Sequence, residues 1–122
     1  MQPILAATST ESSFGATMQV EDLIGKRYRI DFGAFVLHFE LSSVTSAELC
    51  IVEGRSAAAT GHHETLEVEL TEVRDGLVLM SWREQNGVTV TRLDDHERHV
   101  AHARITRPGG RLECLRGSIM AL

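Results

Sequence analysis

The stretch Leu77–Asp95 decides the fold, and it reads LVLMSWREQNGVTVTRLDD. It holds two runs in which apolar and polar residues alternate, with Asn86-Gly87 between them. Asn-Gly between two such runs is the strongest short-range signal for a β-hairpin, because a type I′ turn needs positive φ at both central residues. We therefore expect a two-stranded antiparallel ribbon here.

A two-residue loop would also fix how the two strands pair. Counting outward from Asn86-Gly87 predicts the pairs Gln85–Val88, Glu84–Thr89, Arg83–Val90, Trp82–Thr91 and Ser81–Arg92. Because side chains alternate across a strand, one face would carry Val78, Met80, Trp82, Glu84, Thr89, Thr91 and Leu93. The other would carry Leu77, Leu79, Ser81, Arg83, Val88, Val90, Arg92 and Asp94. Neither face is purely polar, which is typical of a ribbon in a closed or stacked sheet.

The same alternation recurs on both sides of the ribbon and indicates further strands. These cover residues 27–31, 34–41, 46–53, 64–73, 98–106 and 112–120, with turn signals at Gly33, 74–76 and 108–110. About eight short strands joined by turns are typical of a sandwich or barrel. Consecutive hairpins favour an up-and-down meander, and eight strands close into a barrel that is either packed solid or holds one small ligand. The sequence thus predicts an all-β, small antiparallel barrel.

The two ends of the chain differ in character. Residues 1–20 are rich in Ser, Thr and Ala without sustained periodicity, and we expect them to form a flexible N-terminal arm. Residues 21–122 are expected to form the single barrel domain. Between the two, Val20–Ile24 could make one helical turn that ends at Gly25.

Composition excludes several classes of function. The net charge of −5 argues against a general affinity for nucleic acid or for an anionic membrane surface. No apolar run approaches the roughly 20 residues that span a bilayer, and the N-terminus has no basic region before a long apolar run. We therefore expect a cytoplasmic protein that does not bind membranes.

Neither the cysteines nor the histidines form a motif for a metal or cofactor. Cys50 and Cys114 have no CxxC or CxxH spacing, and we expect reduced, structural thiols. The adjacent His62 and His63 would point to opposite faces of a strand, so they are poorly placed to bind one ion together. We expect no metal and no cofactor.

The central ribbon carries a family resemblance. Trp82 and Glu84 end an apolar strand, Asn86-Gly87 makes the turn, Thr89-Val90-Thr91 leads to Asp94, and Arg116-Gly117 lies in the closing strand. This pattern, with the opening Gly25-Lys26-Arg27-Tyr28, resembles the MoaF-like family of calycin-type, lipocalin-like barrels over roughly residues 23–119. The resemblance implies an eight-stranded calycin barrel and little specific chemistry, since fold analogy does not license a function.

Trp82 and Glu84 are the foremost candidate site residues. They lie two apart and so point to the same face of one strand. If that face lines the interior, Trp82 supplies an apolar wall and Glu84 an acceptor or a general base, with its pKa raised by burial. The alternative is that Glu84 lies in solvent near the hairpin end while Trp82 only packs.

Other polar residues could join them. His38 and Glu40 share a strand face, as do His102 and Arg104, while Arg92 and Arg116 lie on separate strands. Inward-facing Arg and His side chains would suit a small anionic or polar aromatic ligand. The alternative is that these residues form the solvent side of amphipathic strands, with Phe35, Leu37 and Phe39 and Ala101, Ala103 and Ile105 as the better core candidates.

Three functions remain open. The first is a small-molecule-binding barrel for a partly apolar, anionic or polar ligand, with walls from Trp82, Phe39 and Met80 and polar contacts from Glu84, Arg92, His38 and Arg116. The second is a small lyase or isomerase that uses Glu84 or a histidine as general acid or base. The third is an oligomerisation module with a solid core and no ligand. A homodimer is expected, because the ribbon is apolar on both faces.

Overall fold

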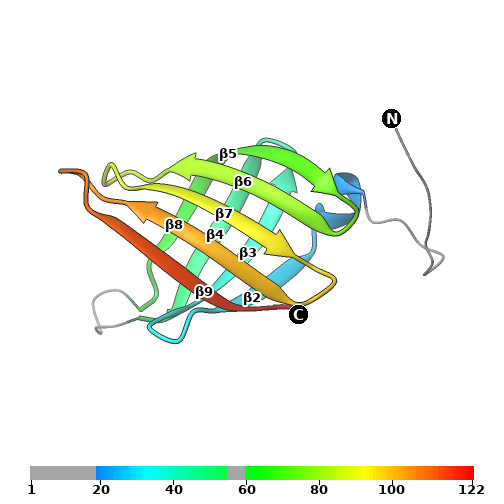
Figure 1. The fold of residues 1–122 in the computed structure, drawn as a ribbon, viewed down its shortest axis with the longest axis horizontal. Helices are drawn as coiled ribbons and strands as arrows, with labels where there is room; N and C mark the ends of the chain where they lie inside the picture. The colour runs from blue at the N-terminus through cyan, green and yellow to red at the C-terminus, as the bar shows by residue number, and fades with distance from the viewer. Residues whose placement is uncertain (1–18, 55–59) are drawn as a thin grey trace.

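Eight strands form one closed antiparallel barrel (Figure 1). The computed structural model describes residues 19–54 and 60–122. The chain runs through η1 (Val20–Leu23), β2 (Arg27–Asp31), β3 (Val36–Ser43), β4 (Ser46–Glu53), β5 (His63–Arg74), β6 (Leu77–Arg83), β7 (Thr89–Asp95), β8 (Val100–Thr106) and β9 (Leu112–Ala121). Each strand pairs with the next along the chain, and β9 returns to pair with β2. The all-β, up-and-down barrel predicted from the sequence is therefore confirmed.

One end of the barrel is covered by the 3₁₀ turn η1. Leu23 is buried at 2% exposure, the backbone N–H of Gly25 donates to the carbonyl of Leu41 at 2.8 Å, and Ile24 bridges to the same residue. The single helical turn before Gly25 thus agrees with the sequence. The predicted flexible arm covers residues 1–20. Its residues 1–18 lie outside the described part of the chain.

The turn between β6 and β7 differs from the prediction by one residue. The N–H of Gly87 donates to the carbonyl of Glu84 at 3.0 Å, and the N–H of Glu84 donates to the carbonyl of Val88 at 2.7 Å. The loop is therefore three residues, 85–87. Gly87 has φ 86°, whereas Asn86 is not among the residues with positive φ, so the turn is not type I′.

This shift changes which side chains share a face. Trp82 pairs with Val90, not Thr91, and Met80 pairs with Arg92, so the predicted pairing of Ser81 with Arg92 is wrong. A slip of one residue moves every side chain of the partner strand to the other face. As a result, Arg92 lies on the interior face together with Trp82.

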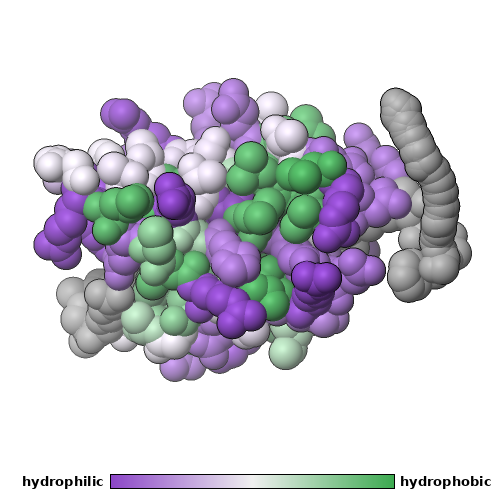
Figure 2. Space-filling model, viewed as in Figure 1, coloured by the Kyte–Doolittle hydropathy of each residue, from purple (hydrophilic) through white to green (hydrophobic). Residues whose placement is uncertain are grey.

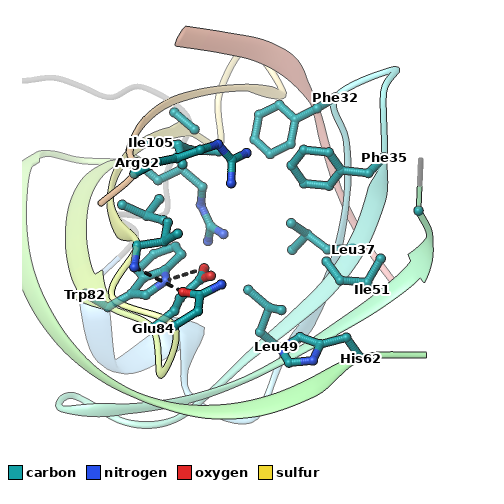
Figure 3. A pocket seen from close by; sticks show the side chains of 16 residues that line it. Phe32, Phe35, Leu37, Leu49, Ile51, His62, Trp82, Glu84, Arg92 and Ile105 are labelled. Atoms are coloured by element: carbon teal, nitrogen blue, oxygen red, sulfur yellow. Dashed lines mark hydrogen bonds between the residues drawn. The ribbon is translucent and has the colours of Figure 1, made fainter. Parts of the chain in front are cut away.

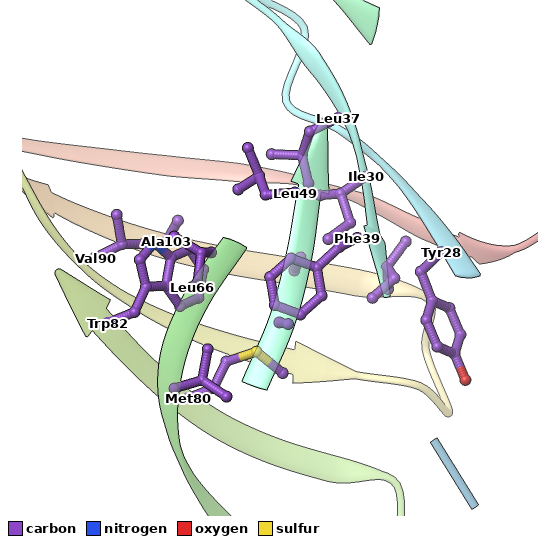
Figure 4. Packing of buried hydrophobic residues seen from close by; sticks show 14 of the residues in the cluster. Tyr28, Ile30, Leu37, Phe39, Leu49, Leu66, Met80, Trp82, Val90 and Ala103 are labelled. Carbon is purple, nitrogen blue, oxygen red and sulfur yellow. The ribbon is translucent and has the colours of Figure 1, made fainter. Parts of the chain in front are cut away.

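Alternate residues of all eight strands form one buried hydrophobic cluster inside the barrel (Figure 4). Phe39 lies between Met80 and Trp82 on one side and Ile30 and Tyr28 on the other. The predicted core residues Leu37, Phe39, Ala101, Ala103 and Ile105 are buried, and Phe35 is half-buried and packs against them. The alternation in β3 is interrupted by a bulge between Val36 and Leu37, which is why both are buried.

Gly117 allows the barrel to close. A Cβ atom at this position would lie 2.1 Å from the carbonyl oxygen of Asp31 and 2.9 Å from Cδ1 of Phe32. The backbones of β2 and β9 approach closely here, at the point where Asp31 pairs with Ser118. The Arg-Gly pair of the closing strand therefore has a structural reason: only glycine leaves room for this seam.

We predict that Gly117→Ala costs about 2 kcal/mol or more in the free energy of unfolding, because the new methyl group meets backbone that must shift. Urea denaturation followed by circular dichroism measures this. Ser118→Ala is the matched control, since Ser118 is its exposed neighbour and should stay within about 0.5 kcal/mol. Equal stability of the two variants would contradict the role given to Gly117.

Candidate functional site

A cavity of about 360 Å³ occupies the barrel at the end opposite η1. Apolar side chains from β3 and β4 lie across it from Trp82 and Glu84 (Figure 3). Such a volume falls within the range of small-molecule sites. The lining residues are Phe32, Phe35, Leu37, Leu49, Ile51, Gly54, His62, Trp82, Glu84, Asn86, Val88, Val90, Arg92, Ala103, Ile105 and Arg107.

Arg92 and Asp94 form a buried ion pair at the inner end of this cavity. The guanidinium donates from Nε to Oδ1 of Asp94 at 2.8 Å and from Nη2 to Oδ2 at 2.9 Å. Both residues are 1% exposed. Two residues apart on β7, they point to the same face, so the strand itself sets the geometry of the pair.

The remaining faces of the Arg92 guanidinium contact aromatic and sulfur groups. Its Cζ lies 4.1 Å from the ring centroid of Phe39 and 5.3 Å from that of Trp82, and Nη2 lies 3.4 Å from Sδ of Met80. A cation over aromatic rings is stabilised by their quadrupoles. Phe39 and Met80, which the sequence placed as walls of the ligand site, therefore lie outside the cavity lining and support Arg92.

One nitrogen of Arg92 is left over. Nη1 is buried and has no hydrogen-bond partner among the residues that the structure describes. An unpartnered buried donor is costly, and in native proteins it needs a reason.

Glu84 and Trp82 are directly joined near the mouth of the cavity. The indole Nε1 donates to Oε2 of Glu84 at 3.2 Å (Figure 3). Burial raises the pKa of the Glu84 carboxyl above its ordinary value of 4.5, and the charge of Glu64 raises it further. The hydrogen bond from Trp82 and the charges of His62 and Arg107 act in the opposite direction.

Two further polar groups surround the mouth. Glu64 is 7% exposed and accepts a hydrogen bond from the backbone N–H of Gln85 at 2.8 Å, and its other oxygen lies 3.1 Å from Nε2 of His62. Arg107 donates from Nη2 to Glu113 at 3.0 Å. These contacts hold the β6–β7 loop and the end of β8 in place beside the cavity.

The structure separates the residues proposed from sequence into three groups. Trp82, Glu84 and Arg92 come together in the cavity lining, whereas Phe39 and Met80 lie beneath Arg92. His38 and Arg116 do not point inward.

The expectation that His38 and Arg116 face the interior is wrong, because each is out of phase with the buried residues of its strand. On β3 the interior positions next to His38 are Leu37 and Phe39, and on β9 Arg116 is exposed beside the inward Gly117. Glu40 is likewise outside the barrel, paired with Arg27 at 3.4 Å.

Sequence reasoning missed Asp94 and Glu64 as members of the site. Both are in phase with apolar residues, Asp94 with Val88 and Val90, and Glu64 with Leu66. A carboxylate that takes an apolar position in an alternating strand is the signal that could have found them. His62 and Arg107, at strand ends, carry no such signal.

Two more titratable groups lie below the ion pair. The rings of Tyr28 and His96 are 4.9 Å apart. Burial raises the pKa of Tyr28, as does the charge of Asp94, and burial lowers the pKa of His96. Both shifts favour the neutral form, so Arg92 and Asp94 are the charged pair at this end.

The fold and the site define a small closed β-barrel with a cavity at one end, lined by apolar groups and a few polar ones. A family model described as MoaF-like matches residues 24–120. The chain belongs to the MoaF-like family, as the pattern of its central ribbon indicated. No curated protein matches the chain in sequence.

A solved structure shares the fold. The crystal structure of a protein from Burkholderia vietnamiensis, described as a "putative beta-lactamase", superposes with a TM-score of 0.76 at 17% sequence identity. The match covers 86% of this chain and all of that chain, 100%. At this identity the likeness concerns the barrel alone.

The described residues offer neither a metal centre nor a helical membrane span. Within 19–54 and 60–122, no group of three or more His, Cys, Asp or Glu side chains could hold a metal ion. In the same part of the chain, no helix is long and apolar enough to cross a membrane.

We predict that the fluorescence of Trp82, the single tryptophan, changes with pH at a midpoint above 4.5, because the pKa of Glu84 is raised. Above this midpoint the Glu84 carboxylate accepts the indole hydrogen bond, and below it the carboxyl is neutral. Between the unfolded and folded pKa values the folded state binds more protons, so stability contributed by Glu84 falls as pH rises.

Two variants check the assignment of this transition. Glu84→Gln should abolish it, and Glu64→Gln should lower its midpoint, because the Glu64 charge raises the pKa of Glu84. An unchanged curve in Glu84→Gln would contradict the prediction.

Proposed function

We propose that this protein binds a small, partly apolar molecule inside the barrel. The single observation that carries the proposal is the cavity of about 360 Å³, whose apolar walls enclose Arg92, a buried side chain with one nitrogen that no described residue partners. Apolar walls with a few fixed polar groups are typical of small-molecule sites. The apolar walls would supply affinity, and the polar groups would fix the orientation of the bound molecule.

The cavity also favours this function over that of a ligand-free oligomerisation module. A solid core would favour such a module, whereas part of the interior here is a cavity. An empty apolar cavity of this size would forgo packing contacts that a ligand can make.

A second candidate function is proton transfer by Glu84. The observation that favours it is the half-buried carboxyl of Glu84, whose pKa is raised and which accepts a hydrogen bond from the indole of Trp82 in the lining of the same cavity. The test is whether a bound compound is turned over. If Glu84→Gln abolishes this turnover and retains binding, the protein is a lyase or an isomerase.

The description of the Burkholderia vietnamiensis protein does not extend to this chain, because 17% identity shows the fold alone.

A cytoplasmic location stays a prediction.

The homodimer also stays a prediction. The outer face of the β6–β7 ribbon carries the half-buried Leu77, Leu79 and Leu93. Figure 2 shows the side of the barrel that faces the viewer in Figure 1, and on this side apolar side chains lie among polar ones.

Titration with N-phenyl-naphthylamine, a neutral apolar dye, tests the proposed binding. We expect saturable binding with enhanced dye emission and simultaneous quenching of Trp82, since the indole lines the cavity. Ala103→Phe should weaken binding at least tenfold, because Ala103 lines the same cavity and a phenyl group would fill part of it.

The matched control is His102→Phe, which adds the same side chain to the next residue of β8 on the exposed outer face. It should leave the affinity within about twofold. Absence of binding to the unaltered protein, or equal affinity in both variants with cooperative unfolding retained, would overturn the proposed function.

A further inference from the structure

We propose that the ligand carries a protonated amine, which donates a hydrogen bond to Oε1 of Glu84 in the cavity. This inference rests on the proposed function and names the chemical class of its ligand. It departs from the anionic ligand that the sequence suggested. Three features of the site support it: an accessible carboxylate oxygen, the pairing of every basic group in the lining, and aromatic rings around the same space.

The carboxyl group of Glu84 has one oxygen to spare. Its Oε2 accepts the indole N–H of Trp82 at 3.2 Å, and Oε1 has no hydrogen-bond partner among the described residues. In that part of the chain, the fully buried side-chain atoms without a partner are Nη1 of Arg92 and Nε2 of His96. Oε1 of Glu84 is therefore accessible, and Figure 3 shows the carboxyl group beside the indole on the side of the open space.

Each basic side chain in the cavity lining already contacts a carboxylate of its own. The pairs are Arg92 with Asp94 at 2.8 Å, Arg107 with Glu113 at 3.0 Å, and His62 with Glu64 at 3.1 Å. None of these three carboxylates belongs to the cavity lining, whereas Glu84 does. Among the described residues, Glu84 is thus the carboxylate in the lining that forms no ion pair.

Arg107 is the cation that an amine would meet nearest the mouth. Its side chain is 40% exposed, so water as well as Glu113 stabilises its charge. It forms no ion pair with Glu84, and burial raises the pKa of Glu84 more than the charge of Arg107 lowers it. Arg107 therefore leaves the Glu84 carboxylate in need of a closer cation.

The balance of charge favours a cation over an anion. The basic groups of the lining and the carboxylates around them comprise two arginines and four carboxylates within the described residues. If His62 is protonated, the carboxylates still outnumber the cations by one. A ligand carboxylate would increase this excess of negative charge, and an ammonium group would reduce it.

Aromatic rings make the same space suitable for a cation with an apolar body. Trp82 lies next to Glu84, and Phe32 and Phe35, with ring centroids 5.4 Å apart, lie across the cavity from it (Figure 3). The faces of such rings attract cations. An ammonium group at Glu84 would lie near the indole, and the rest of the ligand could extend toward the phenyl rings.

Three phenyl probes that differ in one group test the inference on the unaltered protein. They are 2-phenylethylamine, 2-phenylethanol and phenylacetate, each measured by displacement of N-phenyl-naphthylamine at pH 7, where the amine is protonated. We expect the amine to bind about tenfold or more tighter than the alcohol, which is the gain of a charge-assisted hydrogen bond. Phenylacetate should bind more weakly than the alcohol.

Two variants tie this preference to Glu84. Glu84→Gln removes the charge and keeps an oxygen that can accept the indole hydrogen bond, so the amine and the alcohol should bind it within about twofold of one another. The matched control is Glu67→Gln, which removes the same charge from the exposed outer face of β5. This control should keep the preference of the unaltered protein for the amine.

The pH transition of Trp82 fluorescence gives a second readout. A bound ammonium group stabilises the ionised form of Glu84 and should therefore lower the midpoint of this transition. Saturating 2-phenylethanol should lower it by less. Phenyl groups do not absorb where tryptophan is excited at 295 nm, so the probes leave the signal of Trp82 readable.

The outcomes separate the two proposals. If N-phenyl-naphthylamine does not bind the unaltered protein, the binding function itself fails. If the dye binds but the alcohol or phenylacetate displaces it as well as the amine does, the cavity binds ligands and the inference about an amine is overturned. A preference for the amine that persists in Glu84→Gln, or a midpoint that the amine leaves unchanged, would overturn the inference in the same way.

Discussion

The ion pair between Arg92 and Asp94 is the constraint on which the cavity depends. It places a cation at the centre of an apolar barrel, where an isolated charge would be too costly to keep. Asp94 matches that charge through two hydrogen bonds, and Phe39, Trp82 and Met80 also contact the guanidinium. Phe39 and Met80 pack against the pair, and the cavity lies beside Arg92. Arg92 of this pair thus lines the cavity, and Asp94 lies behind it.

The walls follow from the closure of the sheet. Eight strands leave an interior that side chains can just fill, so the cavity exists only where the inward residues do not fill the space. Toward the mouth, Trp82 of β6 lines the cavity together with Glu84 and Val88, which lie just beyond the ends of β6 and β7, on either side of the three-residue loop. Glu64 holds that loop through the N–H of Gln85. At the opposite seam, Gly117 lets β9 lie against β2 and completes the wall.

Strand positions could be predicted from the sequence because alternation is a local property. The runs around Leu66, Val68 and Ala103 mark their strands and inward faces correctly. The hairpin register could not be predicted, because Asn-Gly fits a two-residue loop as well as the three-residue loop that forms, and only tertiary packing decides between them. That one-residue difference brought Arg92 to the face of Trp82. The sequence does not predict that His38 and Arg116 face outward. Which side of a strand faces inward depends on the whole barrel, and polar composition alone does not reveal it.

A double-mutant cycle on the free energy of unfolding tests the role of the ion pair most directly. It compares Arg92→Met, Asp94→Leu and the double variant by urea denaturation. Each single variant leaves a buried charge unpaired and should cost about 3–5 kcal/mol, whereas the double variant should cost less than either one. Additive losses in the double variant would contradict this account, because they would mean that Arg92 and Asp94 stabilise the barrel independently.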